Sequence, residues 1–399
     1  MGRVHIVGAG PAGLRCAEKL AMAGHDVCVI GAEPGLPYNR VALSQYLAGD
    51  FDEAALITHD AERLRKLGIL FRPNTKVLAI DTAGRRLHIV GDASAQYDTL
   101  VLALGSKAFR LPLPGADLAG VLMYRTLDEV RTMLDVARSG GRAVVIGGGL
   151  LGLEAAVGLA RRGMRVTIIH GVDRLMERQL DHAAAALLAA RLESQGLSVQ
   201  LSATTVCIAG STQASGVALK DGRIIPADLV VMAVGIRPET ELARAAGLFV
   251  ERGIVVDDAM RTSDPAIYAI GECAQHDGQC CGLVAPAFAQ AEIAARHICG
   301  EDVCYTALAD CTALKVAGAG VWSAGDIAAV DVEALVYDDP ESGEYRKFLL
   351  RDHRLVGAVL YGETGEAPWY KSLLGSDVSA LRDTLVFGRA YAPLPEAAE

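Results

Sequence analysis

The stretch VHIVGAGPAGL, residues 4–14, decides the fold that we predict for this chain. An apolar run comes before its glycines, and a helix-like run that ends at Gly24 comes after them. Gly8, Gly10 and Gly13 have the GxGxxG spacing of a turn between a strand and a helix. In such a turn the first glycine allows a sharp bend, the second lets a pyrophosphate approach the backbone, and the third lets helix and strand pack closely. The stretch therefore predicts a dinucleotide-binding βαβ unit.

The same unit occurs a second time in AVVIGGGLLGL, residues 143–153. The four glycines recur at one common offset: Gly8, Gly10, Gly13 and Gly24 correspond to Gly147, Gly149, Gly152 and Gly163. A single GxGxxG is a weak signal, because a glycine-rich loop that binds nothing can match it. Two copies in the same strand–turn–helix context favour two dinucleotides, most simply FAD and a nicotinamide dinucleotide. We expect Leu151 to be one of the residues that bind the dinucleotide at the second turn.

Further segments assign FAD to the first unit. Glu33 follows Gly13 by about 20 residues, the distance at which an acid can bond a ribose hydroxyl. The segment YDTLVLALGS, residues 97–106, is a buried strand that ends in a small-residue turn, and TSDPAIYAIGECA, residues 262–274, is an apolar strand that ends in Gly271 and Glu272. Glu272 can accept from ribityl hydroxyls, with a solvated loop acid as the alternative. The candidate FAD residues from this reasoning are Gly8, Gly10, Pro11, Ala12, Gly13, Glu33, Ala103, Gly105, Gly271 and Glu272.

Composition limits the class of protein. A chain of 399 residues with 51% hydrophobic residues and 43 glycines suits an α/β protein of two or three domains. The net charge of −10, without a long basic run, argues against nucleic acid as the main partner. Arg15 interrupts the N-terminal apolar run too early for a signal peptide, and the longest apolar stretch, residues 143–160, carries Glu154 and three consecutive glycines. We therefore expect no membrane span and a cytoplasmic location.

The 9 cysteines do not form a recognisable metal or disulfide motif. Cys16 and Cys28 fall on apolar faces and are expected in the core. Cys280 and Cys281 are adjacent, which is unfavourable for a mutual disulfide, and they lack CxxC spacing. We predict no bound metal and leave open whether this pair has a redox role. The loop GLPYNRVALS, residues 35–44, contains no cysteine, although related flavoenzymes place reactive thiols there.

Together these segments resemble the two-dinucleotide-binding flavoprotein oxidoreductases. Within that group the chain is most similar to the FAD/NADH module of NAD(P)H-dependent nitrite reductases and of assimilatory nitrate reductase electron-transfer subunits, with rubredoxin and ferredoxin reductases as relatives. The stretches that carry the resemblance are AEPGLPYNRVALSQYLAG, YRTLDEV, VVIGGGLLGLEAA, LMERQLD, VGIRP, TSDPAIYAIGEC, GLVAP, LKVAGAGVWSAGD and RLVGAVLYGET. They cover nearly the whole chain, and LMERQLD with GLVAP narrows the resemblance to the nitrite reductase branch.

The resemblance implies an α/β fold with two Rossmann-like domains of the glutathione reductase type and a small α+β domain at the C-terminus. We expect a discontinuous FAD-binding domain over residues 1–112 and 246–308, a NAD(P)H-binding domain over 113–245, and the C-terminal domain over 309–399. Strands are predicted in the last domain at DIAAVDVEALVY, YRKFLLR and RLVGAVLYG, and a helix at PWYKSLLGS. This domain either shapes a docking surface for an electron acceptor or simply packs and dimerises.

The resemblance also implies roles for single residues. Arg40 and Arg125 would lie along the FAD phosphates, where a guanidinium pairs bidentately. Val77 would bond the adenine through its backbone, and the helix near Pro286 would aim its N-terminus at the flavin. In the second unit, Gly235 would border the nicotinamide dinucleotide. Glu154 would face the nicotinamide carboxamide as the one catalytic candidate, with an ordinary helix acid as the alternative.

The chain departs from the ferredoxin reductases in three places. Gln45 stands where those relatives usually carry a lysine, and Asp310, Cys311 and Thr312 stand where they carry an aromatic element. The usual ATG of the flavin-side strand is Ala103–Leu104–Gly105 here, which puts that contact in doubt.

The identity of the nicotinamide is less sharply indicated. His170 stands at the end of the second strand of the unit, where NAD sites usually have an acid. An NADP site would need a cluster of arginines, but we find only Arg174 near this position in the sequence. We predict NADH, mostly from the resemblance, and leave NADPH open.

The sequence thus predicts an FAD-dependent NAD(P)H oxidoreductase that passes electrons to a separate protein. That acceptor would be an iron–sulfur protein, a rubredoxin or a nitrate or nitrite reductase subunit, because the chain ends before any iron–sulfur or sirohaem segment. Two alternatives are a redox-sensing FAD/NADH-binding interaction protein resembling apoptosis-inducing factor, and an oxidase or peroxidase that works through a cysteine. A homodimer is a further expectation.

Overall fold

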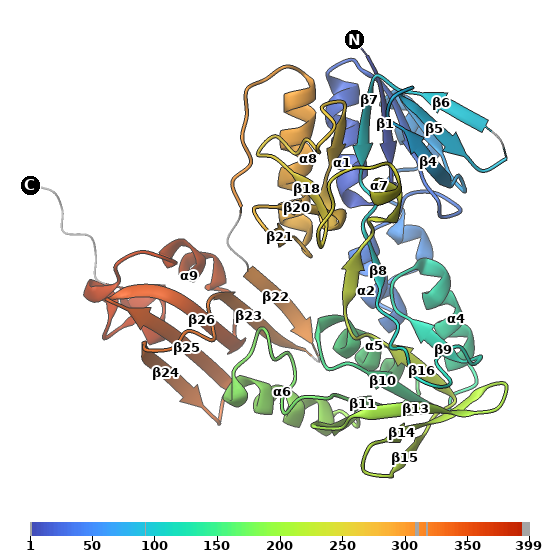
Figure 1. Ribbon diagram of the computed structural model, residues 1–399. Coiled ribbons are helices and arrows are strands. Elements are labelled where there is room, and N and C mark those ends of the chain that lie inside the picture. Colours follow the sequence, from blue (N-terminus) through green and yellow to red (C-terminus); the bar gives the residue numbers. More distant parts are fainter. Residues whose placement is uncertain (1, 92, 308–310, 317, 393–399) are drawn as a thin grey trace, which may run out of the picture.

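The computed structural model describes residues 2–91, 93–307, 311–316 and 318–392 of the chain. Figure 1 shows three parts: an N-terminal part with a sheet and two long helices, a second part below it in green, and a C-terminal sheet in orange and red at the side. Asp310, one of the departures from the ferredoxin reductases, lies outside the described residues.

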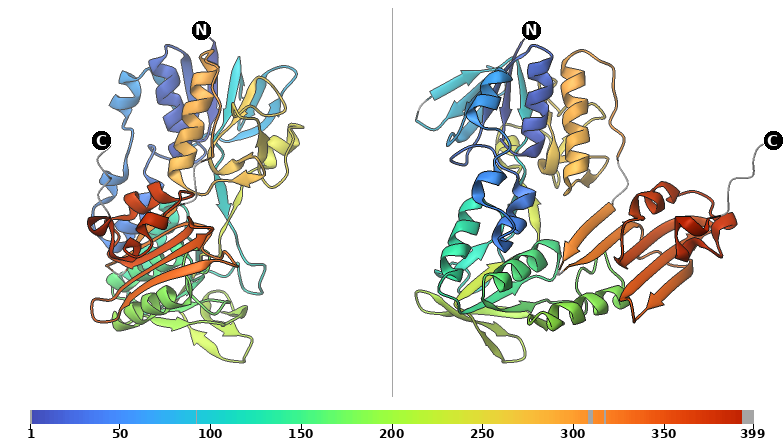
Figure 2. Two further views of the ribbon diagram at one scale, coloured as in Figure 1. Left: turned by 90° about the vertical axis from the view of Figure 1, so that its left-hand side faces the viewer. Right: turned by 180° about the vertical axis from the view of Figure 1, so that it is seen from behind.

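The first part is built on a parallel sheet with the strand order β19-β7-β1-β2-β3. Its strands are β1 (Arg3–Val7), β2 (Asp26–Ile30), β3 (Ile69–Arg72), β7 (Thr99–Leu102) and β19 (Ile267–Ala269). Four of the five residues of β1 and of β2 are buried, as expected for strands covered on both faces. Helices α1 (Pro11–Met22) and α8 (Val284–Ile298) pack side by side (Figure 2). Because β19 and α8 come late in the chain, this part contains residues from both sides of the second part.

A three-stranded antiparallel sheet joins the same core. It consists of β4 (Val77–Asp81), β5 (Arg86–Ile89) and β6 (Ala93–Gln96). Ile80 and Leu87 bury their side chains in the core cluster that also holds β1 and β2. Three short strands lie near α8: β18 (Ile254–Val256), β20 (Ala274–His276) and β21 (Gln279–Cys280).

The second part repeats the first architecture, with a parallel sheet in the order β12-β11-β10-β16-β9. Its strands are β9 (Val121–Met123), β10 (Arg142–Ile146), β11 (Arg165–Ile169), β12 (Ser198–Gln200) and β16 (Leu229–Met232). Its helices are α4 (Leu127–Ala137), α5 (Leu150–Arg161) and α6 (His182–Ser194). The antiparallel strands β13 (Thr205–Gly210), β14 (Ala214–Leu219) and β15 (Ile224–Pro226) extend away from it (Figure 1).

Two connections join these parts. Strands β8 (Ser106–Ala108) and β17 (Ile236–Pro238) run antiparallel between them. The short helix α2 (Leu43–Ala48), which begins within the stretch 35–44, packs Leu47 against α5. An added Cβ at Gly158 of α5 would stand 2.8 Å from the Cγ of Leu47, so the two helices are in close contact. The loop without cysteines therefore lies where the two repeated units meet.

The C-terminal part is an antiparallel sheet in the order β22-β23-β26-β25-β24, followed by α9 (Ala367–Leu373). Its strands are β22 (Cys311–Val316), β23 (Ala319–Gly325), β24 (Glu333–Asp339), β25 (Glu344–Arg351) and β26 (Arg354–Gly362). The strand predicted at DIAAVDVEALVY begins only at Glu333. The earlier half turns instead, because the Asp326 carboxylate accepts from the Ala328 N–H at 3.1 Å and Asp331 has a φ of 56°.

This sheet packs on helix α6 of the second part. Tyr345 and Tyr361 share a core cluster with Leu188 of that helix. The Asp181 carboxylate caps α6 at the Ala184 N–H (3.1 Å) and also accepts from the Tyr345 hydroxyl at 2.7 Å. Among the described residues, no helix is both long enough and apolar enough to cross a bilayer.

Candidate dinucleotide-binding sites

The first glycine turn connects β1 to α1 and needs its glycines for steric reasons. Gly8 has a φ of 118°, and a Cβ there would stand 2.0 Å from the carbonyl oxygen of Ala103. A Cβ on Gly13 would stand 2.0 Å from the carbonyl oxygen of Gly8. Gly10 is different, because nothing lies within 4 Å of the position of its Cβ. The turn is therefore closed at its first and third glycines and open at its second.

The second turn, between β10 and α5, repeats this stereochemistry. Gly147 has a φ of 122°, and its Cβ would stand 2.2 Å from the carbonyl oxygen of Ala233. A Cβ on Gly152 would stand 2.0 Å from the carbonyl oxygen of Gly147, whereas Gly149 faces open space. The equivalence predicted from the repeated sequence thus extends to the space around each glycine.

Both turns fit the pyrophosphate of a dinucleotide. Gly10 and Gly149 are the N-cap residues of α1 and α5, and neither helix start is capped by a side-chain hydrogen bond. Backbone N–H groups at a helix start favour an anion, and the open face leaves it room to approach. Pro11 occupies the first turn of α1, and Leu151, which is 37% exposed, that of α5. Ala12 lies beside Gly271, whose Cβ would stand 3.1 Å from its methyl group.

A network of charged side chains begins near the end of β2 at Glu33. The Glu33 carboxylate accepts from the Tyr38 hydroxyl at 2.6 Å and pairs with the Arg40 guanidinium. The Arg40 guanidinium lies over the Tyr38 ring, 5.1 Å from its centroid. The Tyr38 hydroxyl also accepts from the Leu127 N–H at 3.2 Å, at the start of α4. The loop 35–44 therefore places its tyrosine and arginine against the acid that the sequence assigns to a ribose.

The network continues to the end of β19. Arg40 also donates to the carbonyl oxygen of Arg125, and the Arg125 guanidinium pairs with the Glu272 carboxylate. Glu272 accepts a further hydrogen bond from the Ser106 hydroxyl at 2.9 Å. A Cβ on Gly105 would stand 3.7 Å from Glu272, so this glycine lies beside the pair. Segments from four distant places in the sequence thus meet at one edge of the first sheet.

Most of the predicted FAD residues are brought together in this way, and two others lie apart. Val77, at the start of β4, is buried in the first core, and Pro286 is buried in the first turn of α8. Neither belongs to the hydrogen-bonded network.

Three residues of this region have no role predicted from the sequence: Tyr38, Ser106 and Gln290. Gln290 is 2% exposed, and its side-chain oxygen accepts from the Gly271 N–H at 2.8 Å. Gln290 lies on α8, far along the chain from the glycine turn. Its position one helical turn after Pro286 is the only feature of the sequence that could have indicated its place in this region.

Glu154 lies on α5 near Ser44 and Tyr124. Burial raises the pKa of Glu154 to about 7, and the nearby Ser44 hydroxyl opposes that shift. Burial and the Glu154 carboxyl also raise the pKa of Tyr124. No ion pair to Glu154 is found in the described part of the chain. A half-buried carboxyl of this kind can hold a proton near neutral pH.

The remaining candidates lie beside the second turn. The ring of His170 accepts from the Gly148 N–H through Nδ1 at 3.1 Å, and its Nε2 lies 3.1 Å from a carboxylate oxygen of Glu177. Gly235 has a φ of 110°, and nothing lies within 4 Å of the position of its Cβ. His170 therefore lies beside the second turn, and Glu177 contacts the His170 ring.

The adjacent cysteines lie between β20 and α8. Cys280 and Cys281 are both half-buried and form no disulfide, and burial raises the pKa of Cys280. Cys16 and Cys28 are buried, as predicted. In the described ranges no three His, Cys, Asp or Glu side chains are grouped so that they could hold a metal ion.

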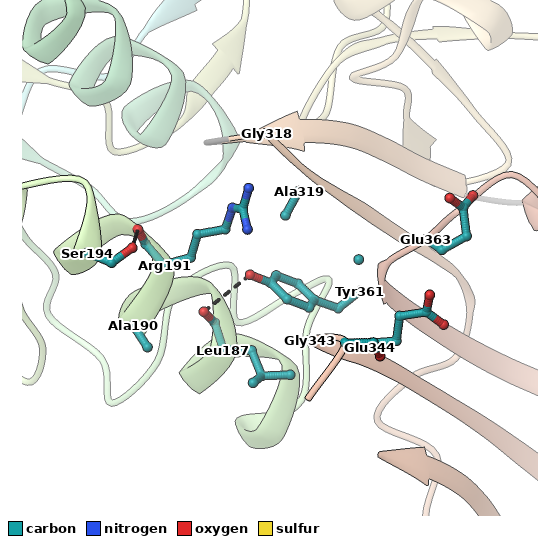
Figure 3. Close-up of a pocket in the computed structure, with 12 residues that line it drawn as sticks. Leu187, Ala190, Arg191, Ser194, Gly318, Ala319, Gly343, Glu344, Tyr361 and Glu363 are labelled. Carbon is teal, nitrogen blue, oxygen red and sulfur yellow. Dashed lines mark hydrogen bonds between the residues drawn. The ribbon is translucent and has the colours of Figure 1, made fainter. Parts of the chain in front are cut away.

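A separate cavity of about 510 Å³ lies between α6 and the C-terminal sheet (Figure 3). Arg191 and Tyr361 point into it from opposite sides, and the Tyr361 hydroxyl donates to the Leu187 carbonyl oxygen at 3.2 Å. No residue of either glycine turn lines it. The cavity thus belongs to the contact between the second part and the C-terminal sheet.

Comparison with known proteins identifies families for both regions of the chain. Residues 2–297 match the family described as pyridine nucleotide-disulphide oxidoreductase, and residues 311–378 match the rubredoxin NAD+ reductase C-terminal domain. A nitrite reductase [NAD(P)H] of Bacillus subtilis is 44% identical over 366 residues, which are 90% of this chain and 46% of that protein. An assimilatory nitrate reductase electron transfer subunit of the same organism is 40% identical over 404 residues, 99% of this chain and 52% of that protein. The chain therefore spans about half the length of these two relatives.

A solved structure supports the same assignment. The ferredoxin reductase from Rhodopseudomonas palustris superposes with a TM-score of 0.88 at 28% identity, covering 96% of this chain and 98% of that chain. The predicted fold class and the predicted resemblance are confirmed by these matches.

Proposed function

Because the chain belongs to the pyridine nucleotide-disulphide oxidoreductase family, we propose that it is an FAD-dependent reductase that takes electrons from NAD(P)H and passes them to a separate redox protein. The observation that carries this proposal is the pair of equivalent glycine turns, each open at its second glycine. One turn alone would accommodate one dinucleotide. Two turns in adjoining units accommodate a flavin and a nicotinamide, the cofactors that the family implies.

The residues of the chain then have distinct roles. When bound, FAD supplies the chemistry that accepts hydride from a nicotinamide and releases electrons to an acceptor. The turn at Gly10 holds the FAD pyrophosphate, and the turn at Gly149 holds that of the nicotinamide. In the charged network, Glu33 bonds the adenosine ribose, Arg40 neutralises phosphate charge, and Glu272 orients the ribityl chain. Arg125 keeps Glu272 in place through their ion pair.

Other residues act on orientation and charge. The start of α8 presents uncapped N–H groups, which stabilise negative charge on a neighbouring ring. Glu154 holds a proton on the nicotinamide side and bonds the carboxamide there. The protein mainly positions the two cofactors, because hydride transfer requires proximity and alignment more than an acid.

The loop 35–44 argues for an external acceptor. It contains Tyr38 and Arg40 but no cysteine, so no thiol in that loop can take electrons from the flavin. We propose a nitrate or nitrite reductase component as the acceptor, because the two relatives at 44% and 40% identity carry those names. A small iron–sulfur protein or a rubredoxin is the second candidate, which the match of residues 311–378 favours.

The test begins with the purified full chain. We expect flavin absorbance, bleaching on anaerobic addition of NADH, and NADH-driven reduction of ferricyanide. A chain without bound flavin, or a flavin that NADH does not reduce, would refute the proposal. Rates with a purified rubredoxin, a [2Fe–2S] ferredoxin and a sirohaem nitrite reductase component then distinguish the acceptors.

Two further expectations can be checked on the same sample. Slow flavin reduction with a long-lived charge-transfer band and an NADH-dependent change of mass would favour the redox-sensing alternative instead. Light scattering tests the predicted homodimer.

A further inference from the structure

We propose that Glu177, held in place by His170, makes the second site select NADH over NADPH. The inference rests on the proposed function, because it concerns the nicotinamide that the second glycine turn would bind. Glu177 would supply the acid that is missing from the end of β11.

The hydrogen bonds of His170 fix the direction in which its ring donates. Its Nδ1 accepts from the Gly148 N–H at 3.1 Å, so the ring proton is on Nε2. That Nε2–H donates to the Glu177 carboxylate at 3.1 Å. The His170 side chain is 13% exposed and that of Glu177 is 36% exposed. A largely buried imidazole therefore orients a carboxylate that still reaches solvent.

The backbone holds Glu177 near the turn as well. The preceding residue, Met176, is fully buried and donates its N–H to the Gly148 carbonyl oxygen at 2.9 Å. The Met176 carbonyl oxygen accepts from the Leu180 N–H at 2.8 Å, and the φ of Met176 is 50°. The N–H of Gly148 thus donates to the His170 ring, and the carbonyl oxygen of Gly148 accepts from Met176. Glu177 follows directly in the chain, and its carboxylate lies 3.1 Å from Nε2 of the His170 ring that contacts the second turn.

The other charged residues of the loop are less suited to select a ribose. The three guanidinium nitrogens of Arg174 donate to Asp173 and to the carbonyl oxygens of Glu177 and Leu180, so this arginine turns into its own loop. Asp173 pairs with Arg174 and with His182. Among the described residues, the side chain that bonds the Glu177 carboxylate is that of His170. Arg178 is exposed and is the rival, because a free guanidinium beside the turn could hold a phosphate.

NADH and NADPH differ at the 2′ oxygen of the adenosine ribose. The adenosine ribose of NADH carries a 2′-hydroxyl, which can donate to a carboxylate. In NADPH the same oxygen carries a phosphate with a charge of about −1.5 to −2 at pH 7. That phosphate would be repelled by the Glu177 carboxylate. The site should therefore accept the unphosphorylated ribose and reject the phosphorylated one.

The test measures binding of adenosine 5′-monophosphate and adenosine 2′,5′-bisphosphate, which are redox-inactive, to the flavin-loaded full chain by calorimetry. We expect the bisphosphate to bind at least about tenfold more weakly to the natural protein, and the ratio to fall about tenfold or more in Glu177→Gln. Asp173→Asn, which removes an acid from the same loop, should leave the ratio unchanged. Steady-state KM values for NADH and NADPH should move in parallel with the binding ratio.

Three results would overturn the inference in a flavin-loaded chain: equal binding of the two nucleotides, an unchanged ratio in Glu177→Gln, or bisphosphate binding that is tight and depends on Arg178. Retained flavin absorbance shows that each variant is folded. A chain that held no flavin and bound neither nucleotide would instead refute the proposed function itself.

Discussion

Replacing Gly149 by alanine should weaken nicotinamide binding without weakening the fold. The backbone at Gly149 has φ −84° and ψ 180°, which alanine adopts without strain. Its Cβ would meet nothing within 4 Å in the protein, yet it would occupy the open face of the second turn. Gly152→Ala is the matched contrast, because its Cβ would stand 2.0 Å from the backbone oxygen of Gly147.

The magnitudes follow from these two environments. At Gly149 the smaller entropy of the unfolded chain favours alanine, while alanine is a poorer N-cap than glycine, so the free energy of unfolding should change by less than about 0.5 kcal/mol. At Gly152 the strand and helix must separate, which costs about 1–3 kcal/mol. A methyl group that keeps the pyrophosphate from one charge-assisted backbone hydrogen bond should cost about 1.5–3 kcal/mol of binding, or roughly 10- to 100-fold in affinity.

The assay uses the flavin-loaded protein, in which nicotinamide is absent until it is added. Thermal unfolding gives the stability of each variant, and titration with NAD+ gives its affinity. Gly10→Ala serves as the counterpart in the first turn and should lower retention of FAD instead. If Gly149→Ala bound NAD+ as tightly as the natural protein, or lost as much stability as Gly152→Ala, the assignment of the open face to a pyrophosphate would be wrong.

Three further predictions concern charged side chains. The pKa of Glu154 is raised by burial to about 7 from an ordinary 4.5, so its ionisation reduces stability as pH rises through that window. Glu154→Gln should therefore be more stable than the natural protein by up to about 3 kcal/mol at pH 8, by less than about 1 kcal/mol at pH 5 and by almost nothing at pH 4, and a pH-independent difference in unfolding would contradict this. Glu272→Ala should cost about 1.5–3 kcal/mol, because it leaves Arg125 without its carboxylate, and a double-mutant cycle with Arg125→Met should show a smaller loss than the sum of the single changes. Asp181→Ala should speed hydrogen exchange in α6 and in the strand β25 while ferricyanide reduction persists, since this residue caps the helix and binds the C-terminal sheet; unchanged exchange would show that the cap is dispensable.

The sequence was sufficient for the features that depend on local stereochemistry. A strand, a GxGxxG turn and a helix follow one another within a few residues. The first and third glycines of each turn are required by their own backbone angle or by a neighbour close in the chain, and the second glycine leaves the turn open. This is why the repeat predicted two dinucleotide units and why the glycines of both turns have the surroundings that their spacing implies. The resemblance, carried by motifs throughout the chain, also indicated the family correctly.

Features that depend on the meeting of distant segments required the tertiary structure. The sequence marked Glu33, Arg40, Arg125 and Glu272 one by one, but not that they form one continuous network at the edge of the first sheet. The strand expected from residue 326 was shortened by turns at aspartates, since side-chain hydrogen bonds to the backbone compete with a sheet ladder.

His170 also shows the difference between what the sequence predicts and what only the tertiary structure shows. In the sequence it is the wrong residue for a ribose-binding acid, and its partner Glu177 is only part of a motif. In the structure a hydrogen bond from the second turn orients the ring, and the ring contacts the Glu177 carboxylate, which we propose as the substitute for the missing acid. The local sequence determined where the backbone makes its sharp glycine turns. Only the folded chain decided which charged side chains lie beside those turns, because such contacts join residues that are far apart in the sequence.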